Sequence, residues 1–425
     1  MTTETTVTTE TTARIGAARV EITPDWPLPL AGFASRTTIS QGVAHPLHLR
    51  VALLESTGTR ALIASADLLN WGPERLPEWR KALSASCGVP EGSVLFSATH
   101  SHSGPQTNGW HAAATGVLDP RFLDLLGERL LAVAAAAAAD MEDVSIARGR
   151  GQHDLGMHRR VVVDGHAMSR PNPDGPVDHE VTVLAFRRAD GSLKAALTHY
   201  TCHPVLSGED QLSGEFTGDA MSRVEERTGA VSLYLQGCCG DTNPGRLAST
   251  GLAEIPKQGA ALADVVSGIL DGALEELRPV PLTARWDGVD LPFKSAPTTA
   301  ELQEASTQDG VMGQWGRAFL EHPERIAASA RLELQRLEIA EGQALLAMNG
   351  EVCLDYGLQI KAVSGGRVLP VAYSNGMIGY IPTATQVDEG GYEADESTRY
   401  YLLAGRFARE LDPLIRAHTV PLATG

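Results

Sequence analysis

The chain has 425 residues, of which 43% are hydrophobic and 20% are charged, a composition typical of a folded globular protein and not of a disordered or fibrous one. Its 52 acidic residues outweigh 35 lysines and arginines, which gives a formal net charge of −17. This excess of negative charge argues against binding to nucleic acid or to an anionic membrane surface.

The first residues carry no sign of a folded element or of an export signal. Threonine and glutamate dominate the segment, which predicts a disordered tail over residues 1–12. The tail lacks the basic and apolar segments of a secretory signal. The longest apolar run, residues 130–139, is too short to cross a bilayer, so no stable membrane insertion is expected.

The elements predicted for the first two thirds of the chain alternate between strands and helices. In chain order they are a strand (17–22), a hairpin (49–54 and 61–66), a helix (73–86), a buried strand (93–97), a long Ala-rich helix (120–140), two strands (181–186 and 193–200), a helix (215–227), a strand (231–235) and a helix (255–277). The Ser-Thr-Gly-Thr segment between the hairpin strands is a typical turn sequence.

The last third is predicted to begin with a polar-faced helix and to end with another helix. The expected elements are a helix over 301–337, strands near 369–373 and 379–381, and a closing helix over 396–411. Hairpins are common and clean βαβ units are few. The predicted fold class is therefore α/β of the mixed α+β type, with layered mixed sheets and flanking helices, in preference to a doubly wound parallel sheet.

The cysteines are scattered, with no pair in a C-x-x-C spacing. This distribution predicts neither a zinc ribbon nor a disulfide framework, and it favours a reducing, cytoplasmic location. The five cysteines are Cys87, Cys202, Cys238, Cys239 and Cys353.

Two histidines, His100 and His102, directly follow the buried strand at 93–97. In an extended chain, residues at i and i+2 lie on the same side of the backbone, so one imidazole could bind a metal while the other faces the same cavity. The alternative is a polar strand end with hydrogen-bonded histidines, because most histidines are not metal ligands.

A second pair of histidines, His199 and His203, lies at the end of the strand predicted for residues 193–200. The four-residue spacing would suit a helix, but the apolar run before it and the proline after it favour a strand. His203 at the strand end is then the candidate ligand, and His199 is more simply explained as a packed core residue. Cys202 would point the opposite way, so it is a less favoured ligand.

An acidic residue and a cysteine pair complete the candidates. Glu351 follows an Asn-Gly turn after an apolar segment, and it either caps a helix that starts there or completes a metal site. Cys238 and Cys239 follow another strand. A nucleophilic role for Cys239 is disfavoured because nothing local supplies a base, and adjacent cysteines are common packing residues.

These motifs, taken in order along residues 14–420, resemble the neutral (alkaline, non-lysosomal) ceramidases and their bacterial relatives. The most specific match is T-H-S-H-S-G-P from Thr99, which is similar to the family's T-H-T-H-S-G-P signature. The other matching segments are V-E-I-T-P from Val20, A-G-F from Ala31, H-P-V from His203, G-D from Gly240, N-G-E from Asn349, Y-S-N from Tyr373, Tyr380, and Y-E-A from Tyr392.

The resemblance implies a zinc site and a set of catalytic residues. Members of that family bind one zinc ion through two histidines, a glutamate and a tyrosine, which here correspond to His100, His203, Glu351 and Tyr380. The family's further histidine, arginine and second tyrosine correspond to His102, Arg159 (or Arg160) and Tyr392. Zinc-activated water would attack a carbonyl, Tyr392 would stabilise the oxyanion, His102 would protonate the leaving amine, and Arg159 would orient a polar or acidic group of the substrate.

The chain departs from the family pattern in two respects. The family's G-D-V-S-P-N segment reads Gly-Asp-Thr-Asn-Pro here, so Asn243 stands at the serine and a serine nucleophile is not expected. We expect Asp241 and Asn243 to contact the substrate instead. The secreted ceramidases also carry a C-terminal β-sandwich domain for which this chain is too short, so a single catalytic domain over residues 13–425 is expected.

The sequence therefore predicts a zinc-dependent hydrolase that cleaves the amide bond of an N-acylated small molecule or lipid. Two alternatives remain open at this point. One is an ester or lactone hydrolase, or an acyl-transfer or cyclising enzyme, that uses the same zinc. The other is a relative that binds zinc without catalysis.

Overall fold

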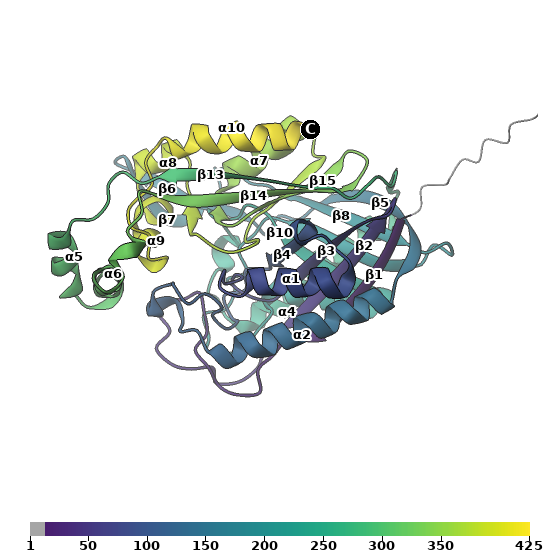
Figure 1. The fold of residues 1–425 in the computed structure, drawn as a ribbon, viewed down its shortest axis with the longest axis horizontal. Coiled ribbons are helices and arrows are strands. Elements are labelled where there is room, and N and C mark those ends of the chain that lie inside the picture. The colour runs from purple at the N-terminus through teal and green to yellow at the C-terminus, as the bar shows by residue number, and fades with distance from the viewer. Residues whose placement is uncertain (1–12) are drawn as a thin grey trace, which may run out of the picture.

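Two sheets of mixed strand direction form the centre of the molecule in the computed structural model, which describes residues 13–425 (Figure 1). The predicted tail, residues 1–12, lies outside the described residues. The longer sheet has the strand order β10-β9-β8-β5-β1-β2-β3-β4, with β12 beside β5. The pairs β3–β4 and β9–β10 are parallel and the others are antiparallel. Its strands are β1 (Ala13–Glu21), β2 (His48–Ser56), β3 (Thr59–Ala66), β4 (Val94–Ala98), β5 (Glu142–Gln152), β8 (Glu180–Arg187), β9 (Leu193–Tyr200), β10 (Val231–Gln236) and β12 (Glu275–Leu277).

The second large sheet has four strands, in the order β13-β14-β15-β17. Two small sheets have the strand orders β11-β6-β7 and β16-β18. Parallel and antiparallel pairs occur together, so the predicted mixed-sheet α/β fold class is confirmed. The strands are β6 (Met157–Val163), β7 (His166–Asn172), β11 (Thr242–Asn243), β13 (Ala284–Pro292), β14 (Ser329–Ala340), β15 (Gln343–Met348), β16 (Glu351–Val352), β17 (Val368–Val371) and β18 (Tyr380–Ile381).

The long sheet folds over so that both of its faces are buried. The Ser65 hydroxyl on β3 donates to the Tyr234 carbonyl on β10 at 2.6 Å, although these strands are far apart in the strand order. Alternate residues of β2 belong to different cores, with Leu53 in one and Leu54 in the other. Burial on both faces explains why the strand sequences are almost continuously apolar and show little alternation.

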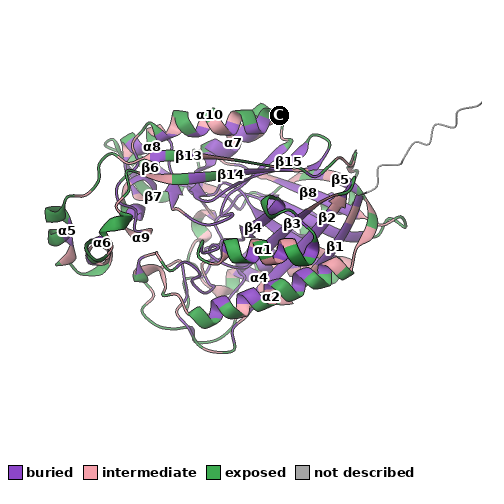
Figure 2. Ribbon diagram, viewed as in Figure 1, coloured by how far each residue is buried: buried purple, intermediate pink, exposed green. Residues whose placement is uncertain are grey.

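Helices cover the outer faces of both sheets, and their solvent sides carry the exposed residues (Figure 2). Helices α1 and α2 cover one side of the long sheet, α3 and α4 pack against its β5, β8 and β10 strands, and α7 and α10 cover the four-stranded sheet. The α-helices are α1 (Leu76–Cys87), α2 (Pro120–Ala139), α3 (Glu215–Thr228), α4 (Ile255–Asp271), α5 (Thr299–Ser306), α6 (Gly310–Glu321), α7 (Leu354–Ser364), α8 (Ala384–Glu389), α9 (Ser397–Tyr400) and α10 (Leu411–Thr424). Short 3₁₀ turns lie at Glu91–Ser93, Ala113–Thr115, Gly245–Leu247, Leu252–Glu254 and Pro323–Arg325, and a π-helical turn spans Tyr392–Glu396. Within residues 13–425, none of the helices has the length and apolarity that a membrane crossing requires.

Three predicted helices are wrong in part. The helix expected over 255–277 ends at Asp271, where Gly272 terminates it, and the segment to 277 forms β12. The helix expected over 301–337 is replaced by α5, α6 and most of β14, because Pro323 breaks the helical run. In β14, exposed Arg331 and Glu333 alternate with buried Leu332 and Leu334, a strand pattern whose charges resemble a helix face.

The closing helix expected over 396–411 is also wrong. The π-helical turn continues into α9, which ends at Tyr400. Leu402 then has a left-handed backbone (φ 46°), and the last helix begins only at Leu411. The left-handed residue interrupts the helical hydrogen bonds, so the segment between the two helices is irregular.

Candidate metal centre

Several strands of both large sheets end at the same place, and the residues just after them form the candidate site. The two sheets meet there through backbone hydrogen bonds from Ala98 N to Tyr373 O (3.1 Å) and from Ala372 N to Gln236 O (3.0 Å). Loops on a rigid scaffold of strand ends are where functional side chains are commonly placed. The residues delivered are Leu69 after β3, His100 after β4, His203 after β9, Cys239 after β10, Glu351 after β15, and Tyr373 after β17.

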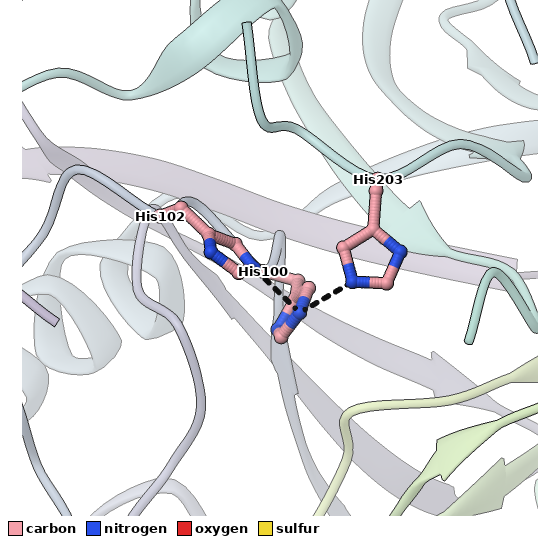
Figure 3. A group of neighbouring side chains, drawn as sticks. All are labelled: His100, His102 and His203. Carbon is pink, nitrogen blue, oxygen red and sulfur yellow. Dashed lines mark hydrogen bonds between the residues drawn. The ribbon is translucent and has the colours of Figure 1, made fainter. Parts of the chain in front are cut away.

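The imidazoles of His100, His102 and His203 converge at this place (Figure 3). His100 Nε2 lies 3.1 Å from His203 Nε2 and 3.1 Å from His102 Nε2. One ligand atom from each ring lies within 4.8 Å of the others, and His100 and His203 have no exposed surface. The two histidine motifs, separated by about a hundred residues in the sequence, are thus brought together as a group that could hold a metal ion.

The hydrogen bonds of the outer ring nitrogens fix the direction of the lone pairs. His100 Nδ1 lies 2.7 Å from the Leu69 carbonyl oxygen, and His203 Nδ1 lies 2.6 Å from the Cys239 carbonyl oxygen. Because a carbonyl only accepts, each Nδ1 carries the proton and each Nε2 presents its lone pair to the centre. Burial lowers the pKa of His203 to about 4, so its ring is neutral at physiological pH.

The Glu351 carboxylate joins the histidines and brings a negative charge. Its Oε2 atom lies 3.2 Å from Nε2 of His100 and 3.2 Å from Nε2 of His203, and Oε1 accepts a hydrogen bond from the Tyr401 hydroxyl. A buried carboxylate that faces converging nitrogen lone pairs is a donor set that a divalent cation would complete.

Glu351 does not cap a helix, so that alternative is wrong. Helix α7 begins at Leu354, and the carboxylate that meets its first N–H group belongs to Asp241, whose Oδ1 lies 2.8 Å from Leu354 N. The other oxygen of Asp241 accepts from the Gln386 amide at 2.7 Å. Asp241 is therefore not among the converging donors, since both of its oxygens are engaged by the scaffold.

Arg159 connects the expected tyrosines to the loop that carries Asn243. It lies at a bulge of β6, and its guanidinium donates to the Tyr380 hydroxyl (3.1 Å), to Asn243 Oδ1 (3.1 Å) and to Glu393 Oε1 (2.8 Å). The rings of Tyr380 and Tyr392 lie edge to face, 5.4 Å apart between centroids. Bulges are commonly found where a side chain is redirected toward a functional site, and this one turns Arg159 toward Tyr380.

Of the two adjacent arginines, only Arg159 contacts a residue of the expected ligand set. Arg160 donates to Glu389 Oε2 (3.1 Å), to the Gly390 carbonyl (2.9 Å) and to Glu393. Tyr380 itself is paired with Glu351 in the β16–β18 ladder, which brings its side chain to the same region. Burial raises the pKa of the Tyr380 hydroxyl well above its ordinary value.

Sequence reasoning missed three side chains that shape this centre. The Tyr373 ring lies over His100 with 4.0 Å between centroids, and its hydroxyl lies 3.5 Å from Glu351 Oε2. The Gln236 amide donates to the carbonyls of Thr99 (3.0 Å) and Cys202 (2.9 Å), the residues that immediately precede His100 and His203. Tyr401 is the third. Gln236 could have been noticed as a polar residue at a strand end, whereas Tyr401 follows no motif.

The thiol of Cys239 is part of the scaffold. Its Sγ lies 3.1 Å from the Tyr373 hydroxyl, and burial raises the pKa of the thiol well above its ordinary value. A thiol held in its protonated form is a poor nucleophile. The contribution of Cys239 to the site is its backbone carbonyl, which orients His203.

The backbone is strained where the ligands leave their strands. His100 and Tyr373, which stack on each other, both have a left-handed backbone, with φ of 68° and 56°. Such conformations cost of order 1 to 3 kcal/mol for a bulky residue and are concentrated at functional sites. The strain is tolerated because each residue is held in place, Tyr373 by the backbone bond from Ala98 N and His100 by the bond of its Nδ1 to the Leu69 carbonyl.

The ring of His102 packs against the backbone at Gly32. A substitution at Gly32 therefore tests whether the reaction depends on the position of this ring. The φ of Gly32 is 99°, and a methyl group added there would lie 2.5 Å from His102 Nδ1. We expect Gly32→Ala to displace the ring and to lower the kcat of the amide hydrolysis predicted from the sequence by about 10²-fold, which is the effect of a shift near 1 Å in a group that takes part in the reaction.

Gly58→Ala is the matched control, because Gly58 also has a positive φ (79°) but has open space around it. Both variants should lose about 1 to 2 kcal/mol of unfolding free energy from the left-handed backbone, measured by urea denaturation. Only Gly32→Ala should lower kcat. Equal kcat values in both variants would mean that the position of the His102 ring is not critical.

Known structures with this arrangement of elements include neutral ceramidases. Neutral ceramidase from Pseudomonas aeruginosa matches with a TM-score of 0.76 at 19% identity, over 98% of this chain and 74% of that chain. A ceramidase complexed with C2 matches with a TM-score of 0.76 at 18% identity, over 98% of this chain and 75% of that chain. No protein-family model and no curated protein matches the sequence. The resemblance predicted from the motifs is confirmed at the level of the fold, which is that of neutral ceramidases.

Proposed function

We propose that this chain is a zinc-dependent hydrolase that cleaves the amide bond of an N-acylated small molecule or lipid. The observation that carries the proposal is the convergence of His100, His102, His203 and Glu351 at one buried point of a ceramidase fold. The match to solved ceramidases supports the reaction class, and the donor set supports the metal.

The residues fit a zinc ion by their chemistry. Zinc binds imidazole nitrogen and carboxylate oxygen, and the site offers such donors in Nε2 of His100, Nε2 of His203 and Oε2 of Glu351. The other ring nitrogen of each histidine and the other oxygen of Glu351 form hydrogen bonds with the protein, which orient the three donors. Tyr380 is the proposed fourth ligand, with Arg159 donating to its oxygen. When bound, zinc supplies a Lewis acid and lowers the pKa of a coordinated water to about 7.

His102 is proposed to move the proton that the leaving amine requires. Its Nε2 atom lies in the group, but its Nδ1 has no hydrogen-bond partner among residues 13–425. Unlike His100 and His203, this ring is not committed to one tautomer, so it can hold a proton on either nitrogen. An amine leaves only when it is protonated as the C–N bond breaks, which is the role of a general acid at Nε2.

Arg159 and Tyr392 are proposed to stabilise the negative charge that develops on the carbonyl oxygen. The Arg159 guanidinium lies over the Tyr392 ring, 5.6 Å from its centroid, and burial raises the pKa of the Tyr392 hydroxyl. The hydroxyl therefore keeps its proton and can donate to an oxyanion. Glu393 balances the charge of Arg159 and holds the guanidinium in place.

A mainly apolar cavity beside the centre, called the apolar cavity below, suits an acyl chain. It has a volume of about 510 Å³, with Trp110, Phe293, Met377 and Ile378 among its apolar walls and Glu74, Glu324, Arg325 and Arg331 among its charged ones. Tyr401 also lines it, and the Tyr401 hydroxyl is the group that contacts Glu351, so one side chain separates the cavity from the carboxylate. A cavity of this size and polarity is typical of a small-molecule site.

Metal removal and substrate panels test the proposal. Treatment with a chelator is expected to lower hydrolysis of an N-octanoyl amide to background, and one equivalent of Zn²⁺ should restore it, because the proposed reaction needs the metal to activate water. The measurements are metal content by mass spectrometry and product release by chromatography. Faster cleavage of the matched octanoyl ester by the same zinc form would favour the ester-hydrolase alternative. Stoichiometric zinc with no turnover of either compound would favour a non-catalytic binding protein.

We also propose that the protein works in a reducing compartment, such as the cytoplasm, as one catalytic domain over residues 13–425. All five cysteines are free and buried, so none contributes a disulfide to its stability. Disulfides are rare in proteins of reducing compartments.

A further inference from the structure

A second, smaller cavity is lined by Arg159 and by other basic residues. It has a volume of about 230 Å³ and is lined by β6, β7, β11 and the turn after β11. The side chains that matter in its lining are Arg159, Ser169, Arg170, Asn243 and Arg246, and no aspartate or glutamate contributes to it. A water occupies about 30 Å³ in the liquid, so the cavity has room for a carboxylate together with several waters.

The charge of this cavity is not neutralised by the protein. The side chains of Arg170 and Arg246 are solvent-exposed, and among residues 13–425 neither forms an ion pair within 4.0 Å, whereas Arg159 is buried and its charge is balanced by Glu393. The chain as a whole has a net charge of −17, whereas the lining of this cavity, within residues 13–425, holds three arginines and no carboxylate. Guanidinium groups bind carboxylates with paired hydrogen bonds.

The cavity is connected to the metal centre through a single side chain. Arg159 lines the cavity and donates to the Tyr380 hydroxyl at 3.1 Å, while its other terminal nitrogen donates to Asn243 Oδ1, which also faces the cavity. The apolar cavity lies beyond Tyr401, whose ring is 5.9 Å from that of Tyr380. Tyr401 therefore borders the apolar cavity, and Tyr380 contacts a residue that lines the basic cavity.

We propose that the basic cavity binds an acidic group on the amine side of the substrate, so that the preferred substrates are N-acylated amino acids with a free carboxylate. This inference rests on the proposed amide hydrolysis and names the class of compound that it acts on. The acyl chain occupies the apolar cavity, and the carboxylate occupies the cavity formed by Arg170, Arg246 and Asn243. A substrate with a neutral headgroup leaves the two arginines unpaired.

Matched substrates test the charge preference. We expect wild-type enzyme to show a KM for N-octanoylglycine about 10-fold lower than for N-octanoylglycinamide, which has the same length without the charge. The double variant Arg170→Gln/Arg246→Gln should lose this difference through a higher KM for the acid, with kcat and the KM of the amide unchanged. The variant Arg170→Lys/Arg246→Lys should keep part of the preference, because it retains the charge. Equal KM values for both substrates in the wild type would overturn the proposal.

A binding measurement separates this proposal from the proposed reaction. In 4-oxoundecanoic acid a methylene replaces the amide nitrogen of N-octanoylglycine, so it cannot be hydrolysed, and 4-oxoundecanamide is its neutral counterpart. Calorimetry on the zinc-loaded enzyme should give about 10-fold tighter binding of the acid, and the glutamine variant should abolish the difference. Equal affinities would refute the basic subsite. Tighter binding of the acid without any cleavage of N-octanoylglycine would refute amide hydrolysis and leave the subsite in place.

Discussion

Replacing His203 with alanine is expected to remove the bound metal and to reduce kcat/KM by more than the roughly 10²- to 10³-fold that loss of a single oxyanion donor costs. His203 Nε2 lies 3.1 Å from His100 Nε2 and 3.2 Å from Glu351 Oε2, so the substitution removes one of the proposed metal ligands. Metal content per chain, measured after dialysis against metal-free buffer, and initial rates are the two readouts.

His418→Ala is the control for this experiment. His418 forms a partly exposed pair with Asp287, with 2.7 Å between Nδ1 and Oδ2, and it lies on α10. The control should retain both zinc and activity. The folded state of each variant is checked by circular dichroism, because an unfolded His203→Ala protein would lose metal for a trivial reason. A folded His203→Ala protein that kept stoichiometric zinc would show that the metal centre is wrongly located.

His102→Ala is expected to keep the metal but to lose about 10²- to 10⁴-fold of kcat for an amide substrate. The carbonyls of Leu69 and Cys239 commit the rings of His100 and His203 to the metal, whereas His102 Nδ1 has no such partner within residues 13–425. The loss should be smaller for an ester of equal acyl length, because an alcohol leaves with less need for protonation than an amine.

The comparison with His100→Ala decides how the roles are divided. His100 Nε2 is the atom closest to both other rings, so its removal should release the metal. If His102→Ala releases zinc as completely as His100→Ala does, then His102 is a ligand and the general acid must be sought elsewhere. If amide and ester rates fall equally in His102→Ala, then His102 does not protonate the leaving group.

The elements predicted correctly from the sequence are those in which local pattern and tertiary environment agree. The β2–β3 hairpin and α2 are marked by a turn sequence and by helix-forming residues, and both occur where expected. The segment that forms β14 was expected to be helical because its charges suggest a polar helix face. Its pairing with β13 and β15 provides the backbone hydrogen bonds that local propensity does not reveal.

The candidate site was predictable only where a motif follows a strand. His100, His102 and His203 stand directly after apolar runs, and the sequence places each of them at a strand end. Gln236 and Tyr401 act through contacts between segments more than thirty residues apart, such as the bond from Gln236 Nε2 to the Thr99 carbonyl. Such contacts depend on how the sheets fold over each other, and one sequence carries no signal for that.

The division of the metal centre between two sheets links ion affinity to the cohesion of the whole molecule. His100 and His203 follow strands of the long sheet, and Glu351 and Tyr373 follow strands β15 and β17 of the four-stranded sheet. If the proposed zinc ion binds here, each tenfold excess of free zinc over its dissociation constant would add about 1.4 kcal/mol to the free energy of unfolding. Because such coupling is reciprocal, a substitution that weakens the packing between the two sheets, even far from the ion, would also weaken zinc binding. Zinc affinity would therefore report on substitutions in distant parts of the core.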